Sequence, residues 1–260
     1  MKNQIKLFLK GIKFYRQAFT FLVKNKLLYF FLFPIIFNFL IYFSGLSLFD
    51  DLRLLIIQYL ESYLEIFGVS EDWWILLLNK FFSISIWLVS KVFFFYIFSL
   101  FGGYLTIILL SPVFTYLSEK TASIQKGKIY NFNFTQFIND IFRAILISVR
   151  SILIQLSMVF ALFLIGFIPV IGWVISIFGN LLIASYFYGF SFLDYTNERH
   201  QLSIKESVKI VRRKKGLAIG LGFVFYLCFF IPLLGGIISS FLAIISVVAA
   251  TISLEETFDN

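Results

Sequence analysis

Charged residues are scarce in this sequence. Asp, Glu, Lys and Arg make up 14% of its 260 residues, against about 25% in an average soluble domain. Hydrophobic residues make up 60%, and the mean hydropathy is +0.93. So few polar groups could not cover a soluble protein of this size, and intrinsic disorder requires low hydrophobicity. The chain is therefore predicted to be an integral membrane protein with a single membrane domain, residues 1–260.

Cysteine and histidine occur only once each. Cys228 lies in an apolar run and has no partner for an intramolecular disulfide. His200 follows Arg199 in a polar stretch, where a solvated loop side chain is its ordinary role. One thiol and one imidazole cannot build a thiolate or imidazole metal site within one chain. We therefore expect no metal site.

Motifs of phosphate binding and of nucleophilic catalysis are also missing. The paired glycines at 102–103 and 235–236 lie in apolar segments without a following P-loop Lys-Ser/Thr, so helix packing or a helix break accounts for them. The sequence contains no nucleophile elbow. We expect a protein that is not an enzyme, has no cofactor, binds no nucleic acid and is not driven directly by ATP.

The first half of the chain predicts one surface helix and two membrane helices. Residues 1–26 combine lysines with an apolar face at helical spacing, made of Ile5, Leu9, Ile12 and Phe19, which is typical of an amphipathic helix on a membrane surface. Residues 27–49 carry no charge and form the first transmembrane helix. The acidic segment 50–80 follows, and Trp73 and Trp74 mark its return to the interface.

Residues 81–118 form the second transmembrane helix, in which Lys91 is the one charge. Lys91 either snorkels to the interface or faces a polar interior. We expect the helix to break near Ser111 and Pro112, because the residue before a proline disfavours helical geometry. A polar connection, 119–143, follows.

Two later charge-free runs, 151–193 and 217–254, each contain a proline followed three residues on by a glycine. The pairs Pro169/Gly172 and Pro232/Gly235 predict turns, and hence helical hairpins over 144–193 and 217–254. The arms before the prolines, 151–168 and 217–231, would reach about 27 and 23 Å. The hydrocarbon core is about 30 Å thick. The hairpins are therefore either re-entrant or spanning.

The segment between the hairpins, 194–216, predicts a basic surface helix. Ser203 and Glu206 match the capping-box spacing. Ile204, Val208 and Val211 form its apolar face, lysines and arginines the other, and Gly216 its C-terminal stop.

The formal net charge of +8 is unevenly distributed. Residues 1–26 hold seven cations and no acid, 119–143 hold four cations, 194–216 hold seven, and 50–80 hold only two. The positive-inside rule places the first three segments in the cytoplasm and 50–80 outside. Two crossings and two hairpins then leave both termini in the cytoplasm, with anionic lipids beside the basic segments.

Several short motifs lie along the chain: Gly102 to Leu105, Ser111 to Phe114, Leu117 to Lys120 with Glu119, Ile168 to Gly172, and Leu193, Asp194, Tyr195 and Arg199. They resemble the patterns G-x-Y-L, S-P, S-E-K, I-P-x-x-G and L-D-Y…R of the CysZ family of sulfate-transport membrane proteins. The resemblance covers most of the chain, from Lys24 onward.

The resemblance implies two long transmembrane helices, two partly penetrating hairpins, a homo-oligomer in the inner membrane, and sulfate uptake for cysteine synthesis. The family commonly has a Gly-Leu-Arg element before the first membrane helix, proposed to contact sulfate. Here the corresponding residues are Asn25, Lys26 and Leu27, so Lys24 and Lys26 supply point charges in place of a planar guanidinium.

An oxyanion pathway needs helix N-termini, backbone N–H groups and cations. The candidate anion contacts are Lys24, Lys26, Lys91, Arg143 and Arg150. Lys24 and Lys26 serve equally well to set topology and contact lipid phosphate. Arg143 and Arg150 lie seven residues apart and share a helix face, where they line a vestibule or snorkel.

The remaining motif residues favour structural roles. Asp194 and Arg199 are expected to form a salt bridge at the turn into the basic helix, with Tyr195 packed at the interface. Glu119 and Lys120 would anchor the interface. The sequence supports a passive or channel-like path for sulfate or a related oxyanion. The alternative is a membrane scaffold, lipid-binding protein or assembly factor of the same fold.

Overall fold

The computed structural model describes residues 2–40, 103–127, 134–231 and 234–258, together with nine residues between 73 and 88. The chain divides into two compact units. Unit 1 comprises Met1–Pro34 and Phe101–Asn260, and unit 2 comprises Ile35–Leu100. Most of the described residues, and all of those considered in detail below, belong to unit 1.

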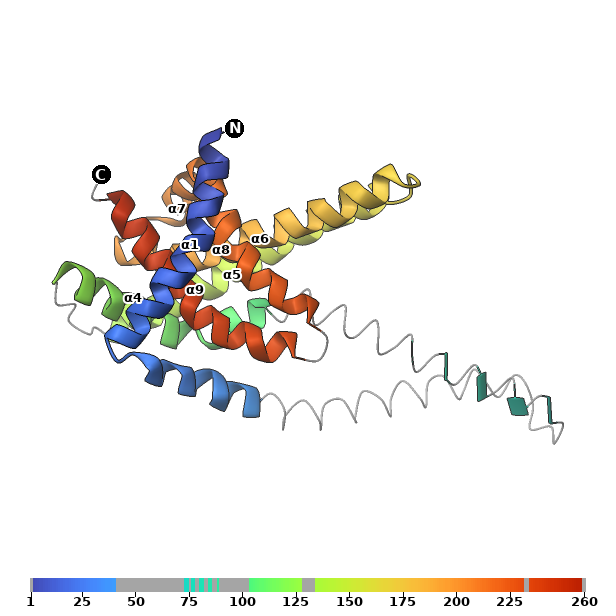
Figure 1. The fold of residues 1–260 in the computed structure, drawn as a ribbon, viewed down its shortest axis with the longest axis horizontal. Coiled ribbons are helices and arrows are strands. Elements are labelled where there is room, and N and C mark those ends of the chain that lie inside the picture. Colours follow the sequence, from blue (N-terminus) through green and yellow to red (C-terminus); the bar gives the residue numbers. More distant parts are fainter. Residues whose placement is uncertain are drawn as a thin grey trace. The chain divides into compact units, whose positions relative to one another are not determined.

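The described part of the chain is helical, as predicted (Figure 1). Its elements are α1 (Lys2–Lys24), η1 (Leu28–Phe31), α4 (Ser111–Lys126), α5 (Phe134–Ile165), α6 (Ile171–Arg199), α7 (Ile204–Arg213), α8 (Lys215–Leu227), η3 (Cys228–Phe230) and α9 (Gly235–Phe258).

Three of the described helices are long and apolar enough to cross a membrane: Phe134–Ile165, Ile171–Arg199 and Gly235–Glu256. Asn3–Lys24 and Leu28–Leu40 form a pair bent by 109° that together make a broken span or a re-entrant loop. Residues 41–49 of the expected first membrane helix, and about half of the expected second one, including 89–102, lie outside the described residues.

Helix α1 has two apolar faces. Phe14, Ala18 and Leu22 are buried, and this inner face packs against α8 and α9. The Tyr15 hydroxyl on the same face bonds to Leu221 O and to Ser246 Oγ. The predicted apolar face, which includes Ile5, Leu9 and Phe19, remains exposed. Periodicity therefore identified the outer face of α1 and missed the inner one.

The predicted break at Ser111 and Pro112 is confirmed. Leu110 forms a turn, α4 begins at Ser111, and Pro112 lies in its first turn, where its missing N–H leaves no bond unmade. Helix α4 then continues to Lys126 and ends at Gly127, whose φ is 65°. Residues 119–126, expected to belong to a polar connection, are therefore helical.

The turn predicted at Pro169 and Gly172 is confirmed, and it joins α5 to α6. Ile171 N donates to Pro169 O over 2.7 Å, and Ser176 Oγ donates to Leu162 O over 2.6 Å. A Cβ on Gly172 would lie 2.0 Å from Ile165 O, so the turn requires glycine. Both helices extend beyond the expected hairpin of 144–193.

The outer part of this hairpin is covered with exposed apolar side chains. In Figure 1 its turn, drawn in yellow, lies away from α1, α8 and α9. Phe163, Phe167, Trp173 and Phe178 are all more than half exposed. Helix α6 is largely exposed over 171–183 and buried from Ala184 to Glu198. An apolar surface of this kind suits contact with lipid chains.

The second hairpin runs from α8 through η3 into α9. Its first arm is the short apolar helix Lys215–Phe230, as its sequence length indicated. Pro232 lies outside the described residues, whereas Gly235 begins α9 and lies against Cys228 O, which a Cβ would approach to 2.5 Å. Most of the apolar stretch of α9 is buried within the protein, so α9 is the central helix of unit 1.

Glycines allow α8 to lie in backbone contact with both α1 and α6. A Cβ on Gly216 or Gly220 would lie 2.1 Å from Gln4 O or 2.3 Å from Phe8 O, both in α1. On the α6 side, a Cβ on Gly222 would lie 1.8 Å from Ser185 O. The expectation that Gly216 stops the basic helix is wrong, because α7 ends at Arg213 and Gly216 is a packing residue inside α8. Small residues of this kind allow close packing of helices in membranes.

The contact between α6 and α8 generates a prediction about Gly189. A Cβ on Gly189 would lie 1.9 Å from Ala218 O, a backbone atom that cannot move away. Gly189→Ala should destabilise the fold by about 1–3 kcal/mol or more, seen as a lower midpoint of thermal unfolding in detergent. Gly179→Ala, on the same helix, is the control, because its Cβ would meet only the movable end of the Leu162 side chain. Equal midpoints for the two variants would contradict this packing.

Candidate functional site

The N-terminus of α7 is fixed by the predicted capping box, which the structure confirms. Ser203 Oγ accepts the Glu206 N–H at 3.3 Å, and Glu206 Oε2 accepts the Ser203 N–H at 2.8 Å. The lysine and arginine side chains of α7 are exposed and Val211 is buried, as its amphipathic pattern indicated. Four residues, 200–203, separate the end of α6 from the start of α7. With α7 starting there, Ser207 lies within hydrogen-bonding distance of Asp194 and Asn197 of α6.

Arg143 of α5 is the cation that holds Asp194 of α6. Its Nε and NH2 groups donate to the two carboxylate oxygens at 2.9 and 3.0 Å, and NH1 donates to Leu202 O. Ser207 of α7 also donates to Asp194. This bidentate geometry is the strong form of a charge-assisted hydrogen bond. The pair joins α5, α6 and the start of α7.

The expected salt bridge between Asp194 and Arg199 is therefore wrong. The two residues are five apart on a continuous helix of about 3.6 residues per turn, so they face different sides of α6. Arg199 instead points to α4 and α9. It donates to Ser118 O at 2.8 Å and Ser118 Oγ at 2.7 Å, and it forms an ion pair with Glu255.

Glu255 of α9 is a functional residue that sequence reasoning missed. Its fully buried carboxylate pairs with Arg199 and Lys126, and His200 Nε2 lies 2.9 Å from it. One carboxylate thus ties the ends of α4, α6 and α9 together. The available signal was the acid directly after the last apolar run, which ended at 254 in the sequence.

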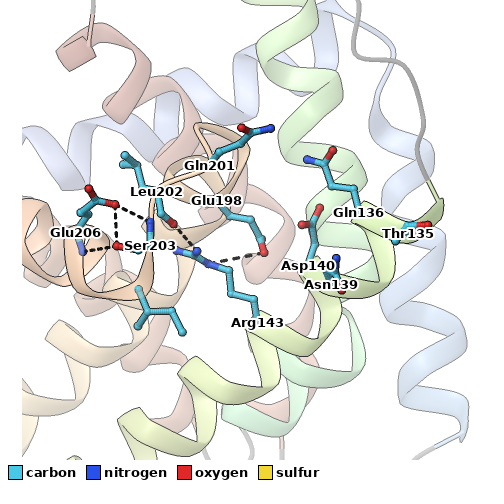
Figure 2. Close-up of a pocket in the computed structure, with 11 residues that line it drawn as sticks. Thr135, Gln136, Asn139, Asp140, Arg143, Glu198, Gln201, Leu202, Ser203 and Glu206 are labelled. Carbon is cyan, nitrogen blue, oxygen red and sulfur yellow. Dashed lines mark hydrogen bonds and ion pairs between the residues drawn. The ribbon is translucent and has the colours of Figure 1, made fainter.

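The pocket in Figure 2, which has a volume of about 770 Å³, lies beside Arg143. Three carboxylates line it against one guanidinium, and in Figure 2 the Arg143 side chain reaches toward Glu198 and Leu202. The guanidinium already pairs with Asp194 and lies 3.7 Å from Glu198, so it is not available to hold a doubly charged anion. The lining residues are Thr135, Gln136, Asn139, Asp140, Arg143, Glu198, Gln201, Leu202, Ser203, Ile204 and Glu206.

A second pocket, of about 340 Å³, has the opposite charge and is called the cationic pocket below. Three cations from three helices line it, namely Arg150 of α5, Arg212 of α7 and Lys215 of α8, together with Tyr186 of α6. The other lining residues are the apolar Ile154, Met158, Leu182, Ile183, Phe187, Phe190, Val208 and Ile219. Arg143 and Arg150 were predicted either to line a vestibule together or to snorkel; in the structure they line different pockets.

Lys24 and Lys26 lie at the bend between α1 and η1, and both are exposed. Lys26 has a φ of 58°, a left-handed conformation that turns the chain. Leu27, the N-cap of η1, makes no side-chain cap bond. The third candidate lysine, Lys91, lies outside the described residues.

The remaining motif residues surround α4. Tyr195 is buried, its hydroxyl donates to Ile107 O at 3.3 Å, and its ring meets that of Phe114 edge-on at 5.8 Å. Glu119 is partly buried, and this burial, with the nearby charge of Asp140, raises the pKa of its carboxyl.

Among the residues described, no cluster of three or more His, Cys, Asp or Glu side chains could hold a metal ion.

The helices and their exposed apolar hairpin define a multi-pass helical membrane protein. The family model described as "Sulfate transporter CysZ/Etoposide-induced protein 2.4" matches residues 14–239, which is most of the chain. The protein belongs to this family, a family of membrane transport proteins and not of enzymes.

The two neighbouring acids at the end of α9 generate a second prediction. Glu255→Gln should destabilise the protein by about 3–5 kcal/mol, because it removes the buried carboxylate with which Arg199 and Lys126 pair. Glu256→Gln is the matched control, since Glu256 pairs at 2.9 Å with Lys10 at the surface and such pairs contribute about 0–1 kcal/mol. Denaturant or thermal unfolding in detergent measures both. A Glu255→Gln variant as stable as the control would rule out this role.

Proposed function

We propose that this protein provides a passive path for sulfate or a related oxyanion across the inner membrane, feeding cysteine synthesis. The match to the sulfate transporter family over residues 14–239 carries the proposal. The sequence contains no ATP-binding motif, which favours a path driven by the ion gradient alone. The family resemblance also supports a homo-oligomer.

We propose that both termini face the cytoplasm, and three contacts within unit 1 support this orientation. Lys10 near the N-terminus pairs with Glu256, and Gln4 bonds to Arg213 O and to the Gly216 N–H. The start of α1, the junction of α7 with α8 and the end of α9 therefore lie together. Two of these segments are strongly basic, and the positive-inside rule assigns such segments to the cytoplasm.

Lys24 and Lys26 are the contacts we propose for the transported anion. They are exposed, and within the described residues neither forms a salt bridge with an acid. They immediately precede the helix Leu28–Leu40, whose first N–H groups add partial positive charge. Two mobile ammonium groups beside a helix start attract an oxyanion without holding it tightly, as conduction requires.

Arg143 has a different role in this proposal. Asp194 and Leu202 occupy its guanidinium, and the acids Asp140 and Glu198 surround it. With its donors already used in this way, the guanidinium has little positive charge left to attract a dianion. We therefore assign Arg143 to holding α7 against α5 and α6.

Flux of labelled sulfate into liposomes containing the purified protein tests the proposal. The informative variant combines Lys24→Gln with Lys26→Gly, because glycine retains the left-handed conformation at position 26 while removing the charge. Sulfate flux should fall several-fold in this variant, since the local concentration of anion at the bend decreases.

The matched control combines Lys6→Gln with Lys13→Gln, which removes the same charge from exposed positions of α1 away from the bend. Its sulfate flux should equal that of the unmodified protein. Flux no greater than in empty vesicles for every oxyanion tried would overturn the transport proposal. An equal fall in both double variants would overturn the assignment to Lys24 and Lys26.

A further inference from the structure

The cationic pocket brings three positive charges together without a compensating acid. Arg150, Arg212 and Lys215 come from α5, α7 and α8, and Tyr186 places its phenol within the electrostatic reach of both arginines. None of the described residues that line the pocket is acidic. Among the described residues these three cations form no salt bridge. An anion from outside the chain would relieve their mutual repulsion.

The rest of the pocket is apolar and opens onto the outer surface of the α5–α6 hairpin. Met158 and Leu182, both lining residues, are 44% and 50% exposed. Next to them along the same two helices lie further exposed apolar side chains, including Leu153 and Phe178. A ligand that fills this site has an anionic head beside the cations and a long apolar tail along the hairpin.

The position of the pocket along α6 agrees with this shape. Helix α6 changes from largely exposed to buried at Ala184, and Tyr186 lies two residues further on. The three cations therefore lie where the lipid-facing part of the hairpin meets the packed bundle. Cations at this level of a membrane protein meet the phosphates of the bilayer, while the apolar wall meets its acyl chains.

We infer that the cationic pocket is a binding site for one anionic phospholipid, such as phosphatidylglycerol. Its phosphodiester accepts bonds from Arg150, Arg212 and Lys215, and an acyl chain lies against Met158 and Leu182. A free sulfate ion would satisfy the cations and leave the apolar wall uncovered. The bound lipid acts as a ligand that joins α5 and α6 to the α7–α8 junction, and it is separate from the anion contacts proposed at Lys24 and Lys26.

Native mass spectrometry of the detergent-purified protein with added phosphatidylglycerol or phosphatidylcholine tests the site. The triple variant Arg150→Gln, Arg212→Gln, Lys215→Gln should lose phosphatidylglycerol affinity by about tenfold or more, because each cation near a lipid surface contributes on the order of 1 kcal/mol. Its affinity for phosphatidylcholine should change much less, because the choline cation of that lipid offsets the charge of its phosphodiester.

The matched control is the triple variant Lys205→Gln, Lys209→Gln, Arg213→Gln, which removes the same charge from exposed α7 positions that do not line the pocket. It should bind phosphatidylglycerol within about twofold of the unmodified protein. If the pocket variant fails to fold, Arg212→Gln alone, at an exposed position, should lower the affinity about fivefold.

Equal losses in the two triple variants, or no preference for phosphatidylglycerol over phosphatidylcholine, would overturn the inference. So would displacement of the lipid by sulfate at constant ionic strength, with sulfate binding itself lost in the pocket variant, because the pocket would then hold a free oxyanion. The Lys24→Gln, Lys26→Gly variant should retain full lipid binding. That result separates the lipid site from the transport proposal.

Discussion

The close approach of α8 to its two neighbours is the constraint on which unit 1 depends. Gly216 and Gly220 admit the backbone of α1, and Gly222 together with Gly189 admits that of α6. In a bilayer, helices gain little from hiding apolar surface from one another, so van der Waals contact at short range must hold them. Because α8 is held in this way, the position of Lys215 at its start is fixed. The last turn of α7, which ends two residues earlier at Arg213, is fixed with it.

Two carboxylates inside the bundle form ion pairs with three of its cations. Asp194 pairs with Arg143, and Glu255 pairs with Arg199 and Lys126. Buried pairs of this kind contribute little net stability compared with apolar packing. Removing one partner nevertheless lowers the stability strongly, because the other charge stays buried. Such pairs therefore favour the one arrangement of helices in which both partners meet. The positive charges that stay at the surface include those of α1, of the bend, of α7 and of the cationic pocket.

The sequence predicted features set by local chemistry. Pro169 followed by Gly172 predicted the first hairpin turn. Ser203 with Glu206 predicted the start of α7, and Pro112 predicted the break at which α4 begins. It did not predict partners, because Arg143 and Asp194 lie 51 residues apart and Arg199 and Glu255 lie 56 apart. Only the packing of whole helices brings such pairs together. The inner face of α1 was missed for a related reason, because its burial depends on the packing of α1 against α8 and α9, which are distant in the sequence.

The position of Glu255 in the chain has a consequence for biogenesis. Chains emerge from the ribosome N-terminus first, so Lys126 and Arg199 are made and placed well before their shared counter-ion exists. Until α9 is made, neither cation can pair with Glu255. These two ion pairs therefore form only after the last hairpin is made, and the contacts that join α4 and α6 to α9 through Glu255 are completed last.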